Sequence, residues 1–194
     1  MDTFDMDRRA ILRAAMATAS IGGVTRAASG GCAEQAPSDG GRKAVVYLSR
    51  SGNTRVLAGA IARRFDADIF EIRPLDPWPE DYEEMVAWAS EWRQRSELMP
   101  LAGAVNLRPY TTVFLGFPIW GMALPAPMRS FLRSTDLAQK IIHPFVTHGG
   151  YGAGNALTEV CSILAKADVL SPFVLKCDQE RATLAALNDW LKQE

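Results

Sequence analysis

The sequence predicts an α/β fold built on a doubly wound, five-stranded parallel sheet. Segments typical of strands and of helices alternate five times along the chain, which is the order of elements in such a sheet. Residues 111–117 form an uninterrupted run of apolar and β-branched residues, as expected of a central strand covered on both faces. Loops rich in glycine and other small residues follow the first, third and fourth predicted strands. Because parallel strands end at one common edge, these loops are expected to meet where such sheets bind ligands.

The first predicted strand and helix meet in the stretch Val45 to Thr54. Apolar residues up to Leu48 give way to small hydroxyl, glycine and amide residues, and a helical pattern follows over 55–65. Such a junction directs backbone N–H groups and the positive end of a helix dipole at one point, where an anion such as phosphate is stabilised.

The remaining elements follow from their periodicity. Residues 67–72 alternate apolar and polar side chains, which predicts the second strand. Residues 80–97 have the pattern of a long amphipathic helix. Its apolar positions, expected in the core, are Met85, Trp88, Ala89 and Trp92. After the strand at 111–117 come a helix at 125–132 with an early proline, a strand at 141–147, a helix at 155–167, a strand at 169–175 and a helix at 179–191.

Residues 1–42 differ in composition from the rest and are assigned to a signal and a flexible tether, with one domain over 43–194. The pair Arg8-Arg9 precedes an uncharged run from Ala14 to Val24, which is shorter than the about 20 residues of a membrane-spanning helix. The segment resembles a twin-arginine export signal. The alternative is a short amphipathic helix packed on the domain.

Cys32 follows small residues, as the lipidated cysteine of a bacterial lipoprotein does. An aliphatic residue normally lies three places before that cysteine, but Ser29 stands there. The alternative is simple cleavage near Ala28. The expected location is therefore periplasmic or exported, with lipid anchoring through Cys32 as an open alternative.

Composition excludes several classes of protein. The 21 basic and 22 acidic residues leave a net charge of -1, so the chain lacks the excess of positive charge that is typical of nucleic-acid-binding proteins. Three cysteines are too few and too scattered for a disulfide framework or a zinc site. Neither paired carboxylates nor a catalytic triad is evident, so we predict no catalytic residues and no metal site.

The first loop has the composition of a phosphate site but lacks two common signatures. Neither the Gly-x-x-x-x-Gly-Lys-Ser/Thr pattern nor the three-glycine dinucleotide fingerprint is present. A turn with a helix N-cap explains Asn53 or Thr54 alone. It does not explain Ser49 and Ser51 as well, which favours phosphate binding.

The second and third loops favour a flat aromatic ligand. The second loop places Trp120 beside small residues, and the third combines His148 and Tyr151 with several glycines whose N–H groups can face a planar heterocycle. A phosphate at one end and a flat ring at the other describe a mononucleotide such as FMN. For His148 itself, a hydrogen bond to the loop backbone is favoured over proton donation.

These three loops resemble those of the flavodoxin family. The family patterns are Ser-x-Ser/Thr-Gly-Asn-Thr, Gly-x-Pro-Ile-Trp-Trp-Gly and Thr-His-Gly-Gly, in that order. The resemblance implies a flavodoxin-like fold of the short-chain type with strand order 2-1-3-4-5, and FMN as cofactor. The implied phosphate residues are Ser49, Arg50, Ser51, Gly52, Asn53 and Thr54, with Arg50 and Arg55 acting chiefly through backbone N–H groups. The implied ring-binding residues are Pro118, Ile119, Trp120 and Gly121 from the second loop and Thr147, His148, Gly149, Gly150, Tyr151 and Gly152 from the third.

Two positions depart from the family pattern. The second tryptophan is replaced by Gly121, and the glycine after it by Met122, so stacking on that side of the ring is expected to be weaker or supplied elsewhere. Tyr151 stands where the family often has a small residue. The nearly neutral domain also weakens the expectation of docking to a basic redox partner.

Three functions are compatible with these features. The first is an FMN electron carrier that serves a redox partner protein or a membrane quinol. The second is an FMN-dependent reductase of quinones or other small acceptors, with Trp78, Trp120 and Tyr151 lining a cleft. The third is a binding module with the fold but no flavin. A receiver domain of the same topology is disfavoured because Ser49-Arg50 replaces its acidic cluster.

Overall fold

The computed structural model describes residues 41–95, 97–177, 187 and 189–192, all of them in one compact unit. The predicted export signal, Cys32 and most of the predicted last helix at 179–191 lie outside the described residues. Within the described part of the chain, none of the helices is long and apolar enough to cross a membrane.

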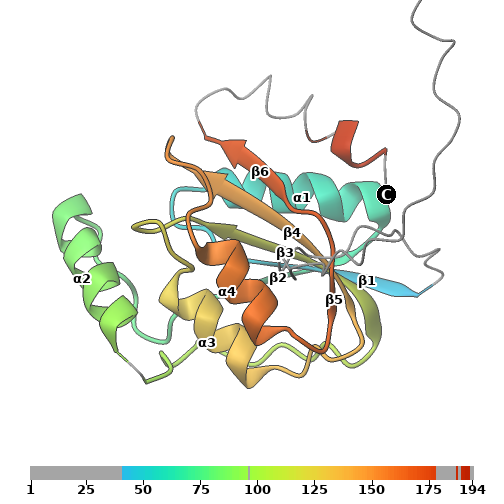
Figure 1. Ribbon diagram of the computed structural model, residues 1–194, viewed down its shortest axis with the longest axis horizontal. Helices are drawn as coiled ribbons and strands as arrows, with labels where there is room; N and C mark the ends of the chain where they lie inside the picture. The colour runs from blue at the N-terminus through green and yellow to red at the C-terminus, as the bar shows by residue number, and fades with distance from the viewer. Residues whose placement is uncertain (1–40, 96, 178–186, 188, 193–194) are drawn as a thin grey trace, which may run out of the picture. The chain divides into compact units, whose positions relative to one another are not determined.

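A parallel sheet forms the centre of the fold (Figure 1). Its strands are β1 (Arg42–Tyr47), β2 (Asp68–Glu71), β3 (Tyr110–Pro118), β4 (Ile141–His148), β5 (Asp168–Val169) and β6 (Phe173–Lys176). They pair in the order β2-β1-β3-β4-β5, with β6 also on β4. The expected strand order is therefore confirmed. Arg42, assigned to the tether, is the first residue of β1, where its guanidinium bonds Asp68.

Helices cover both faces of the sheet. They are α1 (Asn53–Phe65), α2 (Tyr82–Gln94), α3 (Ala126–Ser134) and α4 (Ala156–Ile163). Alternate residues of β1 belong to separate core clusters, with Val45 packed against Leu57 of α1 and Val46 in the cluster that contains Met128 of α3. In Figure 1, α1 lies behind the sheet, while α3 and α4 lie in front of it. The sheet is thus buried on both sides, as its apolar strands require.

The predicted fifth strand at 169–175 is wrong in one respect, because it is two short strands. Val169 pairs with Ile142, and Phe173 pairs with Phe145. Between these two pairs the segment therefore contains one residue more than β4 does. Pro172 lies in the interruption, and proline has no N–H to donate to a sheet. The chain therefore leaves the ladder and returns to it.

The core prediction for α2 is wrong for its tryptophans. Met85 is the buried residue of this helix, whereas Trp88 and Trp92 are half-buried. In Figure 1, α2 lies to one side of the sheet rather than over a face. Its side chains therefore meet a loop instead of the core.

Candidate functional site

Backbone and side-chain hydrogen bonds join the three glycine-containing loops at the carboxyl edge of the sheet. The hydroxyl oxygens of Thr54 and Thr147 are 2.8 Å apart, and both residues are buried. The N–H of Ile119 donates to the carbonyl of Thr147 at 2.9 Å. Thr147 therefore contacts the first loop through its side chain and the second through its backbone. The predicted meeting of the loops is confirmed.

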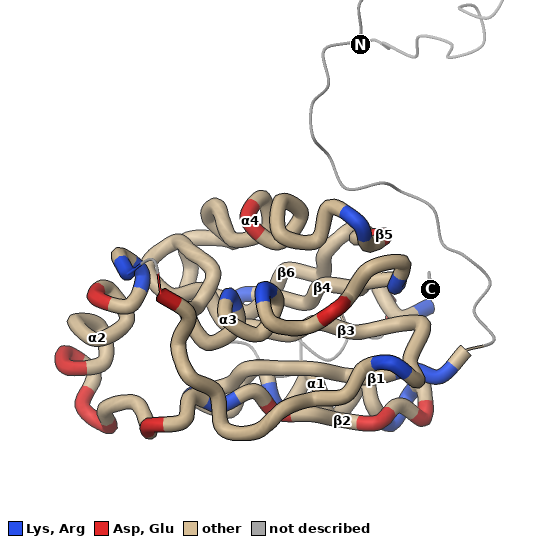
Figure 2. The backbone as a smooth tube through the Cα atoms, turned by 90° about the horizontal axis from the view of Figure 1, so that it is seen from below, with Lys and Arg blue, Asp and Glu red and all other residues tan. Residues whose placement is uncertain are grey.

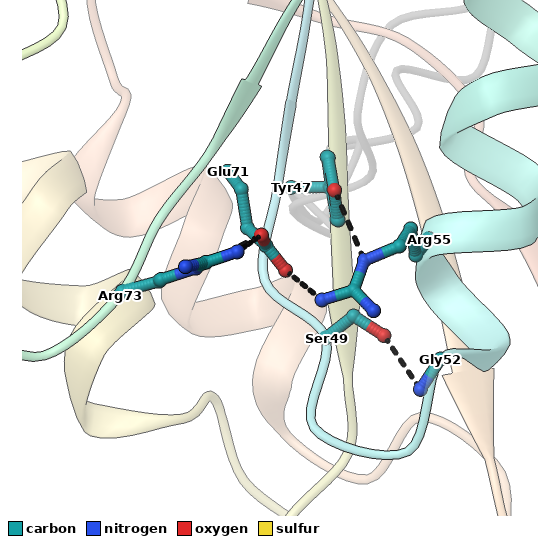
Figure 3. Close-up of polar contacts among 6 residues, drawn as sticks. All are labelled: Tyr47, Ser49, Gly52, Arg55, Glu71 and Arg73. Carbon is teal, nitrogen blue, oxygen red and sulfur yellow. Dashed lines mark hydrogen bonds and ion pairs between the residues drawn. The ribbon is translucent and has the colours of Figure 1, made fainter. Parts of the chain in front are cut away.

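The first loop ends at an uncapped helix. Gly52 occupies the N-cap position of α1 with φ of 94°, a conformation that glycine adopts without strain. Its N–H donates to the hydroxyl of Ser49 at 3.1 Å (Figure 3). Among the described residues no side chain caps α1, and its first turn contains no acidic residue. The first N–H groups of α1 are consequently available to an anion.

The side chains of the first loop divide into two groups. Ser49 and Thr54 are 2% and 1% exposed, whereas Ser51 and Asn53 lie at the surface. The Arg50 guanidinium donates to the carbonyl of Glu80 at 2.7 Å. The Arg50 side chain is therefore engaged with the segment before α2, and its contact with the phosphate through the backbone stays a prediction.

Arg55 supplies a positive charge beside this helix N-terminus. Its guanidinium donates to Glu71 at 2.5 Å and to the Tyr47 hydroxyl at 3.4 Å, and Arg73 also pairs with Glu71 (Figure 3). The hydrogen bond from Arg55 to Glu71, followed by that to Tyr47, raises the pKa of Arg55 above its ordinary value. Two arginines share one carboxylate, so the group carries a net positive charge that favours an anion at the neighbouring loop.

The second loop is a tight turn closed by two backbone hydrogen bonds. Trp120 donates to the carbonyl of Ala123 at 3.3 Å, and Ala123 donates back at 3.2 Å. Gly121 and Met122 between them both have positive φ, at 56° and 64°. A Cβ on Gly121 would lie 2.7 Å from the Arg93 guanidinium, which also donates to the Gly121 carbonyl. Gly121 thus lies against the Arg93 side chain of α2, and its positive φ disfavours a tryptophan at this position.

Tryptophans from elsewhere in the chain surround Trp120. The ring of Trp78 lies 6.0 Å from Trp120 and nearly perpendicular to it, and Trp88 of α2 lies 6.4 Å away. Trp92 continues the row at 6.3 Å from Trp88. The peripheral position of α2 therefore places aromatic surface next to the second loop. The pattern of α2 in the sequence did not indicate this contact.

Gly154 and Asn155, which follow the third loop, were not predicted as site residues. The Asn155 N–H donates to the carbonyl of Met122 at 3.0 Å. A Cβ on Gly154 would lie only 2.1 Å from that same oxygen. The segment before α4 therefore holds the turn of the second loop by direct backbone contact. In the sequence, only the glycine at position 154 pointed to a close contact, and its partner could not be identified there.

The third loop folds back on His148. Its Nδ1 accepts hydrogen bonds from the N–H groups of Gly150 and Gly152, both at 3.1 Å. The expected backbone hydrogen bond of His148 is confirmed. The expectation that the glycine N–H groups face a ligand is wrong for Gly150 and Gly152, because these two are engaged inside the loop. Tyr151, 87% exposed, projects from the loop.

No cleft defined by Trp78, Trp120 and Tyr151 together is evident among the described residues. Trp78 and Trp120 are in contact, but Tyr151 makes no ring contact with either of them. A cavity of about 550 Å³ lies elsewhere, between residues 98–108 and 130–136. Across the described ranges, three or more potential metal ligands do not gather at any point.

The comparisons with known proteins agree with this architecture. The flavodoxin family model matches residues 42–193. A putative flavoprotein from Bacteroides uniformis is 25% identical with a TM-score of 0.69, and the alignment covers 79% of this chain and 99% of that one. A putative flavoprotein from Bacteroides eggerthii is 24% identical with a TM-score of 0.67, covering 78% and 96%.

A third solved structure is a flavoprotein from Lactobacillus acidophilus in complex with FMN. It is 16% identical with a TM-score of 0.62, covering 75% of this chain and 99% of that one. At this identity the likeness concerns the fold. No curated protein matches the sequence.

Proposed function

The chain belongs to the flavodoxin family, and from this premise we propose that it binds FMN at the three loops and transfers electrons through it. The observation that carries the proposal is the uncapped N-terminus of α1, joined through Thr54 and Thr147 to the loop of His148. One of the solved structures that share this fold contains FMN.

The residues present fit a phosphate at the first loop. The N–H groups at the start of α1 have no side-chain cap within the described residues, and the Thr54–Thr147 hydroxyl pair retains a hydrogen that is not used between the two oxygens. Ser51 and Asn53 add exposed polar side chains. Together these groups provide several donors and little fixed charge at the point of contact.

The second and third loops would border the ring. Ile119 and Trp120 are half-buried, and the Ile119 N–H donates to the Thr147 carbonyl, so this edge offers apolar surface together with backbone polar groups. When bound, FMN supplies the electron chemistry, accepting or donating one or two electrons. The loops orient it, limit water on one side and place neutral donors near it, which is how the protein sets its potential.

The carrier function is supported by a local concentration of charge. Figure 2 shows acidic residues gathered at the start of α2 and just before it, with basic residues at its other end; the acidic residues at the start are Glu80, Asp81, Glu83 and Glu84. α2 also contacts the second loop through Trp88. A redox partner with a basic surface would be attracted to this side, despite the nearly neutral chain.

The reductase function is supported by the tryptophans. Trp78 and Trp88 stand around Trp120, and flat acceptors such as quinones stack well on indole rings. These contacts extend the aromatic surface beyond a single ring, which a pure carrier does not require.

The purified full-length protein is expected to be yellow, with the visible absorption of oxidised flavin that is lost on reduction. A colourless protein that stays colourless after incubation with FMN and desalting would contradict FMN binding. Steady NAD(P)H oxidation with a quinone and no partner protein would favour the reductase, and its absence in a flavin-loaded sample would favour the carrier. Trp88→Leu is a matched test, since it should slow the quinone reaction while FMN binding is retained.

We further propose that the protein is exported through the twin-arginine route, supported by Arg8-Arg9 and the uncharged run after them. This route carries folded proteins, as a noncovalently bound cofactor requires. Because NAD(P)H is scarce outside the cytoplasm, a membrane protein or quinol would then supply the electrons. Fractionation is expected to find a shortened protein in the periplasm or membrane, and Arg8→Lys with Arg9→Lys should retain it in the cytoplasm. A full-length protein confined to the cytosol in both cases would contradict export.

A further inference from the structure

His148 is fixed at the end of β4 from two sides. Its carbonyl accepts a hydrogen bond from the N–H of Cys177 at 3.0 Å, which ties its backbone to the end of β6. Its Nδ1 accepts the N–H groups of Gly150 and Gly152 at 3.1 Å each. The half-buried ring therefore stands inside the bend that residues 149–152 make.

The bend depends on an unprotonated nitrogen. A ring nitrogen that accepts hydrogen bonds carries no proton, so the neutral imidazole has its hydrogen on Nε2. Gly150 and Gly152 have φ of 138° and 78°, which belong to glycine conformations and to no helix or strand. The two hydrogen bonds to Nδ1 are thus the interactions that select this loop shape.

We propose that His148 is a positioning residue for the FMN site. Its Nδ1 holds residues 149–152 in the shape that borders the ring, through the two hydrogen bonds that it accepts from Gly150 and Gly152. This inference rests on the proposed function, since the loop is expected to contact FMN. It assigns His148 a role in shaping the site rather than in proton transfer.

Several other side chains lie near His148. Lys176 of β6 is in register with His148, and its Cε lies 3.7 Å from where a Cβ on Gly150 would be. Cys177 follows it, and Tyr151 belongs to the loop. β3 and α1 contribute Pro118 and Thr54 beside Thr147, and neither of these side chains titrates. The variants below retain all these groups.

Two variants of equal shape separate the hydrogen bonds from the ring. In His148→Asn, Oδ1 occupies about the position of Nδ1 and accepts the same N–H groups without titrating. In His148→Leu, a methyl group stands there and accepts nothing. FMN affinity of the full-length proteins would be measured by fluorescence titration.

We expect His148→Asn to bind FMN about tenfold more tightly than His148→Leu, because only the Asn variant retains the two acceptor interactions with the loop. Equal binding by the two variants would overturn the proposal.

Amide NMR signals of the FMN-free protein provide a readout that does not depend on the flavin. Those of Gly150 and Gly152 should shift in His148→Leu relative to the wild type, because both hydrogen bonds to residue 148 are lost, and should shift less in His148→Asn. If the wild type fails to bind FMN, the proposed function is wrong, while these signals still decide whether His148 holds the loop. Unchanged glycine signals in His148→Leu would contradict the inference even if FMN binds.

Discussion

Thr54→Asp is expected to weaken FMN binding about a thousandfold. Thr54 is buried in the first turn of α1 against Thr147, so the introduced carboxylate would stand beside the phosphate. Two like charges about 4 Å apart at an effective dielectric constant of about 20 repel by about 4 kcal/mol, which corresponds to a factor of about a thousand. Retained flavin after desalting, and the dissociation constant of the reconstituted protein, measure the effect.

Thr54→Asn is the matched control, because it has the same shape without the charge. It should weaken FMN binding about tenfold or less, while both variants keep the fold. An acidic residue in the first turn is favourable to a helix, but position 54 is buried and burying a carboxylate is costly, so the apo form of Thr54→Asp should unfold at a lower temperature than that of Thr54→Asn. Circular dichroism of the apo proteins checks that both are folded before FMN is added. Equal FMN affinity of the two variants would show that the phosphate lies at another loop.

Gly154→Ala is expected to lower the free energy of unfolding by about 2 to 5 kcal/mol. The new Cβ would collide with the Met122 carbonyl at 2.1 Å, and the residue has φ of 56°. A left-handed conformation costs an alanine about 1 to 2 kcal/mol, and overpacking adds about 1 to 3 kcal/mol. Urea unfolding monitored by circular dichroism measures the change.

The same substitution at Gly149 provides the control. A Cβ there would have no neighbour within 4 Å, and Gly149 is not among the glycines with positive φ. Gly149→Ala should therefore change the stability of the apo protein by less than about 0.5 kcal/mol. If both variants were equally stable, the contact between residue 154 and the second loop would not be important for the fold.

The sequence alone was sufficient for the alternation of strands and helices, and with the family resemblance for the strand order. It was also sufficient to predict that the three glycine-containing loops lie at the carboxyl edge of the sheet. These features depend on local patterns. Short apolar runs rich in β-branched residues, such as 111–117, are typical of buried strands, and Gly52 with its hydroxyl neighbours is typical of a helix start. Residues that are close together along the chain determine these features.

Contacts between distant segments required the tertiary structure. Pro172 divides a strand whose sequence pattern is continuous, because proline has no N–H to donate to β4 at that position. The periodicity of α2 predicts a buried face, yet the helix lies beside the sheet and its Trp88 meets Trp120. Periodicity shows that a face is apolar, but not which partner covers it.

The carboxyl edge shows the same division. The Ser, Asn and Thr residues of the first loop indicated a phosphate site from the sequence, because their donors are close together along the chain. The hydroxyl pair of Thr54 and Thr147 joins residues 93 positions apart, and the N–H groups of Gly150 and Gly152 turn inward to His148. Residue type determines which hydrogen bonds a loop can make, whereas the packing of the strands that carry the loops decides which of them form.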